Sequence, residues 1–203
     1  MLIEDTVPAG SYEPSPTGSL FHDLKDGQSF LITISNSQED PIELRIIHSP
    51  GHTKDSICIH FPSDKVLYTA DTILGQGSTV FEDLGTYIST LRALLWLRDQ
   101  YTVLYPGHGP VVKDGPWLIR EYIAHRMERD NQILTVMQQP HPEGQEVWST
   151  WDIVSEIYAA YPKDMWAPAA KGISQHLDKL TSEGKVRRFG GEGKDTQWGL
   201  SKL

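Results

Sequence analysis

The sequence predicts a mixed α/β fold, of the α/β or α+β class, followed by a small winged-helix module. Two observations predict the first part. Short alternating or apolar segments typical of strands occur at 30–35, 42–49, 56–61, 66–71 and 102–109. Amphipathic segments typical of helices occur at 86–101 and 118–138. The third observation is at the end of the chain, where two helical segments precede two short strands joined by the glycine-rich GGEGKD.

Turn and cap signals support these elements in order. The strand at 42–49 stops at Pro50-Gly51, the strand at 66–71 ends on an acid, and the strand at 102–109 is broken by a second Pro-Gly pair. In the C-terminal module, Ser149 or Thr150 caps a helix over 152–161, and Gly184 stops a helix over 169–185. Strands follow at 186–189 and 197–201, whereas residues 1–20 are predicted to be an irregular lead-in.

Charge is distributed unevenly and suggests a module boundary. Residues 1–147 hold 10 lysine and arginine against 20 aspartate and glutamate residues, whereas residues 148–203 hold 8 against 7. We therefore expect a partial hydrolase-like domain over 1–145 and a winged-helix-like module over 146–203, joined near QQPHPEGQE. The acidic main body argues against strong nonspecific nucleic-acid binding over that surface.

Compartment signals are sparse. The chain has one cysteine, Cys58, which is expected to pack as a small buried hydrophobe and excludes an internal disulfide. The first ten residues lack the basic and apolar regions of a signal peptide, and no apolar run approaches the ~20 residues of a membrane span. We expect a cytoplasmic protein that does not associate with membranes.

Three predicted strands end in a polar residue beside a turn, and these residues are candidate metal ligands. They are His52 in HSPGHTKDS, Asp71 in LYTAD, and His108 in LYPGHG. Because a sheet aligns the ends of its strands, we expect the three side chains to converge, and two imidazoles with a carboxylate suit zinc. The remaining histidines have no such context and are interpreted as structural: His22, His48, His60, His125, His141 and His176.

The stretches HSPGHTKDS, LYTADTILGQGSTVFEDL and LYPGHGPVV, in this order and spacing, resemble the second half of the metallo-beta-lactamase superfamily. The resemblance is to its beta-lactamase-like branch, which includes a mitochondrial endoribonuclease and fungal thioesterases that release polyketides from an acyl carrier protein. It implies the C-terminal part of an αββα sandwich with two zinc ions. It assigns His52 to the first site, Asp71 to a bridging carboxylate and His108 to the second site, with Thr53 supporting His52 by a hydrogen bond.

The resemblance also implies an upstream His-x-His-x-Asp-His motif, which this sequence does not contain. We therefore expect an N-terminally truncated relative that binds zinc weakly or not at all on its own. Its catalytic residues beyond the metal ligands remain unassigned.

Three functions are consistent with these observations. The first is a zinc-dependent thioesterase acting on an acyl (polyketide) group held by an acyl carrier protein or polyketide synthase in secondary metabolism. In that case the loop at 75–84 and several tryptophans line an apolar pocket. The second is a single-strand-specific endoribonuclease that uses the basic residues of the winged helix: Lys171, Lys179, Lys185, Arg187 and Arg188. The third is a catalytically inactive binding module. We favour the thioesterase and consider nucleic acid the less favoured partner.

Overall fold

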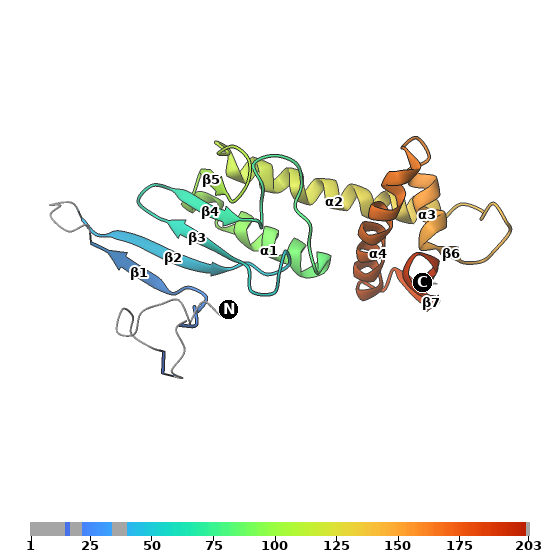
Figure 1. The fold of residues 1–203 in the computed structure, drawn as a ribbon, viewed down its shortest axis with the longest axis horizontal. Helices are drawn as coiled ribbons and strands as arrows, with labels where there is room; N and C mark the ends of the chain where they lie inside the picture. The colour runs from blue at the N-terminus through green and yellow to red at the C-terminus, as the bar shows by residue number, and fades with distance from the viewer. Residues whose placement is uncertain (1–14, 17–21, 34–39, 202–203) are drawn as a thin grey trace, which may run out of the picture.

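A computed structural model describes residues 15–16, 22–33 and 40–201 (Figure 1). Its N-terminal unit is built on a five-stranded sheet whose strands run in chain order. The strands are β1 (Ser29–Ile32), β2 (Ile42–His48), β3 (Ile57–Phe61), β4 (Val66–Ala70) and β5 (Val103–Pro106). Neighbouring strands are antiparallel except β4 and β5, which are parallel. The predicted mixed α/β class is confirmed, although the predicted extension of β1 to residue 35 falls partly outside the described residues.

The parallel pair arises because a helix connects its strands. Helix α1 (Leu84–Trp96) and the 3-10 turn η2 (Arg98–Gln100) return the chain from the end of β4 to the start of β5. The side chain of Asp83 accepts a hydrogen bond from the backbone N–H of Thr86, which caps α1 and contributes about 1 kcal/mol to its stability. As a result, β4 and β5 both finish at the same end of the sheet, and this end carries the candidate site.

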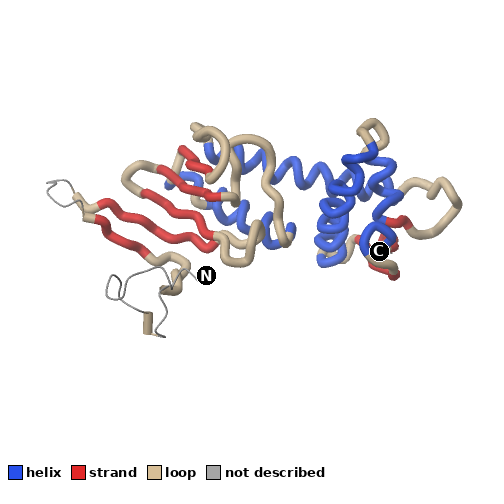
Figure 2. The backbone as a smooth tube through the Cα atoms, in the orientation of Figure 1, coloured by secondary structure: helices blue, strands red, loops and turns tan. Residues whose placement is uncertain are grey.

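Helices α1 and α2 (Gly115–Met137) supply the apolar side chains that pack against the sheet. The first hydrophobic core joins the two layers and includes Leu67, Leu104, Leu91 and Ile119, all fully buried. Other large apolar side chains of the sheet unit are exposed; they include Phe30, Leu31, Ile32, Tyr68 and Tyr105. Figure 2 shows the strands of the large sheet side by side in this unit, with helix packed against them.

The C-terminal unit is a winged helix, as predicted. It contains α3 (Thr150–Ile157), the 3-10 turn η3 (Lys163–Met165) and α4 (Trp166–Ser182). A three-stranded sheet in the order β6-β8-β7 completes it, with β6 at Trp148–Ser149, β7 at Val186–Gly190, β8 at Gln197–Leu200, and the 3-10 turn η4 (Gly193–Asp195) between the last two. Ser149 and Asp152 form a reciprocal capping box at the start of α3. The short strand β6 was not predicted, because two residues carry no periodic signal.

Helix α2 belongs to both units. Its first half packs in the core of the sheet unit, whereas Ile133 and Met137 pack in a second core with residues of α3, α4 and the small sheet. Figure 1 shows this helix running from one unit to the other. The two units are therefore held together by one continuous helix. Within the described residues, no helix has both the length and the apolar character needed to cross a bilayer.

Candidate functional site

The loop after β2 presents His52 at the end of the sheet that faces the winged helix. Gly51 has a φ of 125°, and a Cβ added there would lie 2.4 Å from the Cα of Tyr87. The position therefore requires glycine, because a side chain would collide with helix α1. The hydroxyl of Thr90 on the same helix donates to the Pro50 carbonyl over 2.6 Å, which fixes the turn.

The imidazole of His52 is oriented by the loop at 79–80. Its Nδ1 lies 2.8 Å from the carbonyl oxygen of Val80 and 3.3 Å from the Oγ1 of Thr79. A carbonyl only accepts hydrogen bonds, so Nδ1 is the donating nitrogen, and in a neutral ring Nε2 is the nitrogen with the free lone pair. This is the arrangement that metal-binding histidines use, with one nitrogen donating to the protein and the other left to coordinate.

Asp71 follows a strained backbone position at the end of β4. Ala70 has a φ of 44°, in the left-handed region that side chains rarely adopt, and the β4–β5 register shifts between Tyr68 and Ala70. The backbone N–H of Gly107 donates to the Ala70 carbonyl over 2.8 Å. A Cβ on Gly107 would lie 2.7 Å from Oδ1 of Asp71, so glycine is needed for β5 to end this close to the carboxylate.

His108 lies directly beside Asp71. Its Nε2 is 3.5 Å from Oδ1 of Asp71, and the side chains of the two residues are 76% and 42% exposed. The backbone N–H of Gly75 donates to the His108 carbonyl over 2.9 Å, which anchors the loop after β5 to the loop after β4. The structure therefore brings together two of the three sequence-predicted residues.

The third residue, His52, is linked to this pair through Thr79. The Thr79 hydroxyl donates to the backbone carbonyl of Asp71 over 2.5 Å and lies beside the ring of His52. Within the described residues, no group of three His, Cys, Asp or Glu side chains is arranged to hold a metal ion. The donor set consists of a close Asp–His pair and a separate imidazole that is already in a metal-binding tautomer, and these chemical types suit zinc.

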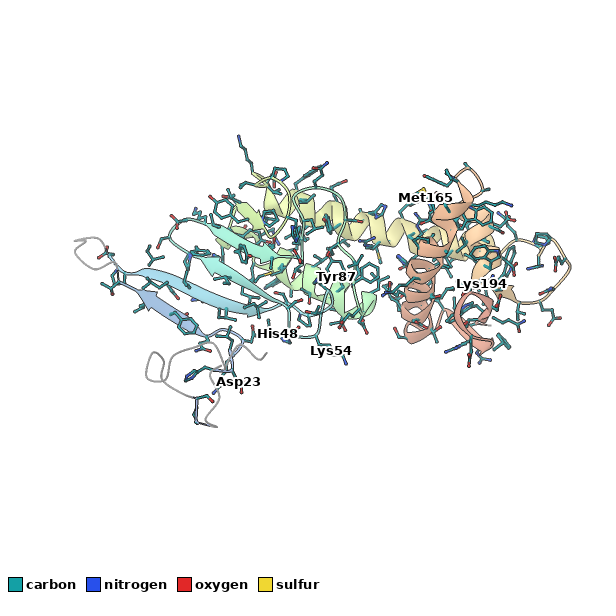
Figure 3. All side chains as sticks on the ribbon, viewed as in Figure 1. Asp23, His48, Lys54, Tyr87, Met165 and Lys194 are labelled. Carbon is teal, nitrogen blue, oxygen red and sulfur yellow. The ribbon has the colours of Figure 1, made fainter. Side chains whose placement is uncertain are left out.

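Thr53 makes its side-chain contacts elsewhere. Its hydroxyl donates to Asp55 over 2.7 Å and shares a 2.7 Å hydrogen bond with Ser56. The contacts that the structure provides to the ring of His52 come from Thr79 and Val80, and the supporting role of Thr53 stays a prediction. His48 points away from the site, since its Nε2 lies 3.0 Å from the carbonyl of Lys54; Figure 3 labels both residues at this end of the sheet unit.

Two tyrosines and an arginine that the sequence analysis did not single out hold the loop at 72–80. The hydroxyl of Tyr87 donates to the Thr72 carbonyl over 2.7 Å, and that of Tyr122 donates to Gly77 over 3.0 Å. Arg126 donates from Nη2 to the Thr79 carbonyl over 3.0 Å. These partners are 15 to 47 residues apart in the chain, so no local motif could have indicated them.

A cavity of about 440 Å³ adjoins His52. The loop predicted to line a pocket contributes Ser78, Thr79, Val80, Phe81 and Glu82. The other described lining residues are His52, Thr53, Arg126, Pro168, Lys171, Gly172 and Gln175. The loop at 75–84 thus lines a cavity, as expected, but no tryptophan is among the described lining residues. Gln175 of α4 also donates to the Phe81 carbonyl over 2.5 Å, which ties the winged helix to the loop.

The predicted basic cluster of the winged helix is interrupted. Lys179 has only 6% of its side chain exposed, because its Nζ donates to Asp130 and Glu183 at 2.7 and 2.6 Å. Lys185 is also paired, with its Nζ 2.8 Å from Glu183. A buried, paired lysine cannot contact a phosphate backbone. The prediction that Lys179 belongs to an RNA-binding cluster is therefore wrong.

Two family models match the chain. The model described as "Metallo-beta-lactamase superfamily" covers residues 16–108, and the model "Beta-lactamase associated winged helix domain" covers residues 149–198. The class defined by fold and site is thus a metallo-beta-lactamase domain joined to its associated winged helix. The chain belongs to the metallo-beta-lactamase superfamily.

Curated proteins from animals and fungi match most of this chain. A "Beta-lactamase-like protein 2 homolog" from Drosophila melanogaster is 35% identical over 85% of this chain and 54% of its own length. An "Atrochrysone carboxyl ACP thioesterase" from Aspergillus chevalieri is 30% identical over 81% of this chain and 51% of its own. The crystal structure of a beta-lactamase domain protein from Burkholderia ambifaria has the same fold, with a TM-score of 0.69 at 18% identity over 89% of this chain and 52% of that one. The chain spans about half the length of the curated relatives it matches.

Proposed function

We propose that this chain carries part of the active site of a zinc-dependent hydrolase that cleaves acyl thioesters, with an acyl carrier protein as the partner that presents the substrate. The observation that carries the proposal is the Asp71–His108 pair, which lies where β4 and β5 end. Nε2 of His108 is 3.5 Å from Oδ1 of Asp71, and His52 is linked to the pair through Thr79. We assign His52, Asp71 and His108 as metal ligands.

Zinc, when bound, would lower the pKa of a water molecule and polarise the carbonyl under attack. The chain's own residues would supply orientation. Val80 and Thr79 hold the His52 ring so that Nε2 faces outward as a ligand, and Gly107 lets β5 end against the carboxylate of Asp71. A polyketide origin of the acyl group belongs to the same proposal, and a carrier-bound acyl substrate is supported by the relative named as an ACP thioesterase.

The thioester is favoured over RNA by the charge around the site. Lys179, one of the basic residues that an RNA-binding surface would need, is buried in an ion pair, and the sheet unit is acidic. The cavity beside His52 combines apolar Val80, Phe81 and Pro168 with polar groups. Such a mixed lining suits an acyl chain on a polar carrier arm better than a polyanion.

The test is zinc-dependent turnover. The purified chain should release thiol from an acyl pantetheine thioester in the presence of millimolar zinc, and both Asp71→Asn and His108→Ala should abolish the zinc-dependent part. Single-stranded RNA should remain intact under the same conditions. RNA cleavage in place of thiol release would favour the endoribonuclease, and the absence of zinc-dependent thiol release would favour the inactive binding module; either result would overturn the proposal.

A further inference from the structure

A second cavity adjoins the one beside His52. It measures about 250 Å³ and lies between α2, α3, α4 and the loop at 78–81. The two cavities have Ser78, Phe81, Arg126, Pro168 and Gly172 as common lining residues. They therefore lie side by side, and we call the pair the interdomain channel, with His52 at one end. The opposite end, which we call the arginine end, is lined by His125, Arg129, Tyr158, Ala169, Ile173 and His176.

Arg126 stands where the two cavities meet. The residue is only 8% exposed, and its guanidinium lies 4.9 Å from the centre of the Phe81 ring. One nitrogen, Nη2, donates to the Thr79 carbonyl, but the buried Nε has no hydrogen-bond partner within the described part of the chain. A buried cationic donor without a partner is costly, because it has lost water and gained nothing in return. Arg126 therefore places a cationic side chain at the junction of the two cavities.

The charge is uneven along the channel. At the His52 end, the cation of Lys171 is accompanied by the carboxylate of Glu82. At the arginine end, Arg126 and Arg129 are not accompanied by any carboxylate among the described lining residues. Arg129 is itself placed by Tyr158, with its guanidinium 4.8 Å from the ring centre.

The two histidines at the arginine end do not reverse this balance. His125 and His176 add no negative charge in either protonation state. The nearest buried acid, Asp130, is occupied: Nδ1 of His176 and Nζ of Lys179 each lie 2.7 Å from its carboxylate oxygens. The arginine end is therefore a cationic cavity with no carboxylate among its described lining residues, which suits a phosphate group.

We propose that the arginine end of the interdomain channel binds the phosphate of the substrate's carrier arm, so that the substrate is an acyl thioester of a phosphorylated pantetheine. The phosphate contacts Arg126 and Arg129, the pantetheine arm passes Phe81 and Gly172, and the thioester reaches the His52 end. This inference rests on the proposed function, since only a thioester hydrolase needs both ends of the channel.

Binding to the metal-free chain tests this inference without requiring turnover. Calorimetric titrations in a chelator would compare 4′-phosphopantetheine with pantetheine, which differ only by the phosphate. Phosphopantetheine should bind at least ~10-fold more tightly, as expected for a charge-assisted contact with arginine, and inorganic phosphate should compete with it. Equal affinities for the two arms would overturn the proposal.

Variants locate the phosphate within the channel. Arg129→Gln should weaken phosphopantetheine binding ~10-fold and leave pantetheine binding unchanged. Arg120→Gln is the matched control, because Arg120 is exposed on the same helix and does not line the channel. Lys171→Gln should have a smaller effect than Arg129→Gln. A loss as large in Arg120→Gln or Lys171→Gln as in Arg129→Gln would contradict the assignment. Arg126 itself is not substituted, because it also holds the loop that carries Thr79.

The source of the arm is distinguished by two further ligands, free coenzyme A and an acyl carrier protein bearing phosphopantetheine. Binding of either ligand that is weakened by Arg129→Gln supports the proposal and identifies the source, whereas binding of neither contradicts it. Because no metal is present, this result is independent of zinc-dependent turnover. A chain that binds the phosphorylated arm without turnover would contradict the proposed activity alone.

Discussion

The hydroxyl of Thr79 donates a hydrogen bond to the backbone carbonyl of Asp71 over 2.5 Å. The same oxygen lies 3.3 Å from Nδ1 of His52, so one buried side chain connects the two strand ends on which the candidate ligands stand. Arg126 in turn holds the backbone of Thr79 from the long helix α2. The position of the ligands therefore depends on the loop that follows Asp71 and on a helix that lies far from the ligands in sequence.

Replacing Thr79 with valine should disturb the ligands. Thr79→Val keeps the shape of the side chain but leaves the Asp71 carbonyl without its donor and removes one partner of His52. We expect zinc affinity to fall ~10-fold, in the range found when partners of metal ligands are removed, and stability to fall by ~1–2 kcal/mol. Zinc titrations followed by NMR and urea denaturation measure the two effects.

The matched control is Thr53→Val, which removes a hydroxyl bonded to Asp55 and Ser56. A greater loss of zinc affinity in Thr53→Val than in Thr79→Val would show that Thr53 supports His52, as the sequence alone predicts, and that the role given to Thr79 is wrong.

Gly107→Ala should move the carboxylate of Asp71. The added methyl group would lie 2.7 Å from Oδ1 of Asp71, closer than such atoms approach, so the carboxylate or the loop must shift. We expect the Asp71–His108 pair to separate and zinc affinity to fall ~10-fold with the fold retained. Gly85→Ala, in helix α1, places its methyl group at an ordinary 3.4 Å from Asp83 and should change neither property. Unchanged zinc affinity in Gly107→Ala would show that the close approach has no role in metal binding.

The sequence was sufficient to predict the strands other than β6, the helices α1 to α4 and the winged helix, because each has a local periodic or capping signal. It also indicated His52, Asp71 and His108, since each follows a strand and two of them follow Pro-Gly. It could not indicate Thr79, Tyr122 or Arg126, whose roles come from contacts between distant segments. Lys179 was misjudged for the same reason, because its partner Asp130 lies 49 residues away on another helix.

The buried group formed by Asp130, His176 and Lys179 should make stability depend on pH. Burial would raise the pKa of Asp130, but hydrogen bonds from His176 and Lys179 outweigh it and lower that pKa below its usual 3.8. Burial also lowers the pKa of His176 below its usual 6.5, despite the opposing effect of Asp130.

For both groups the unfolded state binds protons more readily than the folded state. Stability is therefore full near neutral pH, begins to fall below about pH 6.5 as His176 is driven toward protonation, and falls further near and below pH 3.8. Denaturation at several pH values should show this acid-side loss. Asp130→Asn should cost about 3 kcal/mol at pH 7 and flatten the profile below pH 5, whereas the exposed Asp99→Asn should do neither. A profile in Asp130→Asn that is as steep as in the wild type would contradict this account.

Cys58 should be inert in the folded chain. It is fully buried in strand β3, and burial raises the pKa of its thiol to about 11, so the reactive thiolate is scarce at neutral pH. A disulfide-exchange reagent such as 5,5′-dithiobis(2-nitrobenzoic acid) should label it no faster than the chain unfolds, and immediately in urea. Rapid labelling of the native chain would show that this part of the sheet opens to solvent.

The central claim is that His52 and His108, and no other histidine, bind metal together with Asp71. Long-range ¹⁵N–¹H correlation spectra of the histidine rings, recorded while zinc is added, test it most directly. We predict weak binding by the chain alone, with dissociation constants above the micromolar range, and selective shifts of Nε2 in His52 and His108 that disappear in Asp71→Asn. Shifts at His48, His60 or His141 instead, or sub-micromolar binding that survives Asp71→Asn, would contradict the account.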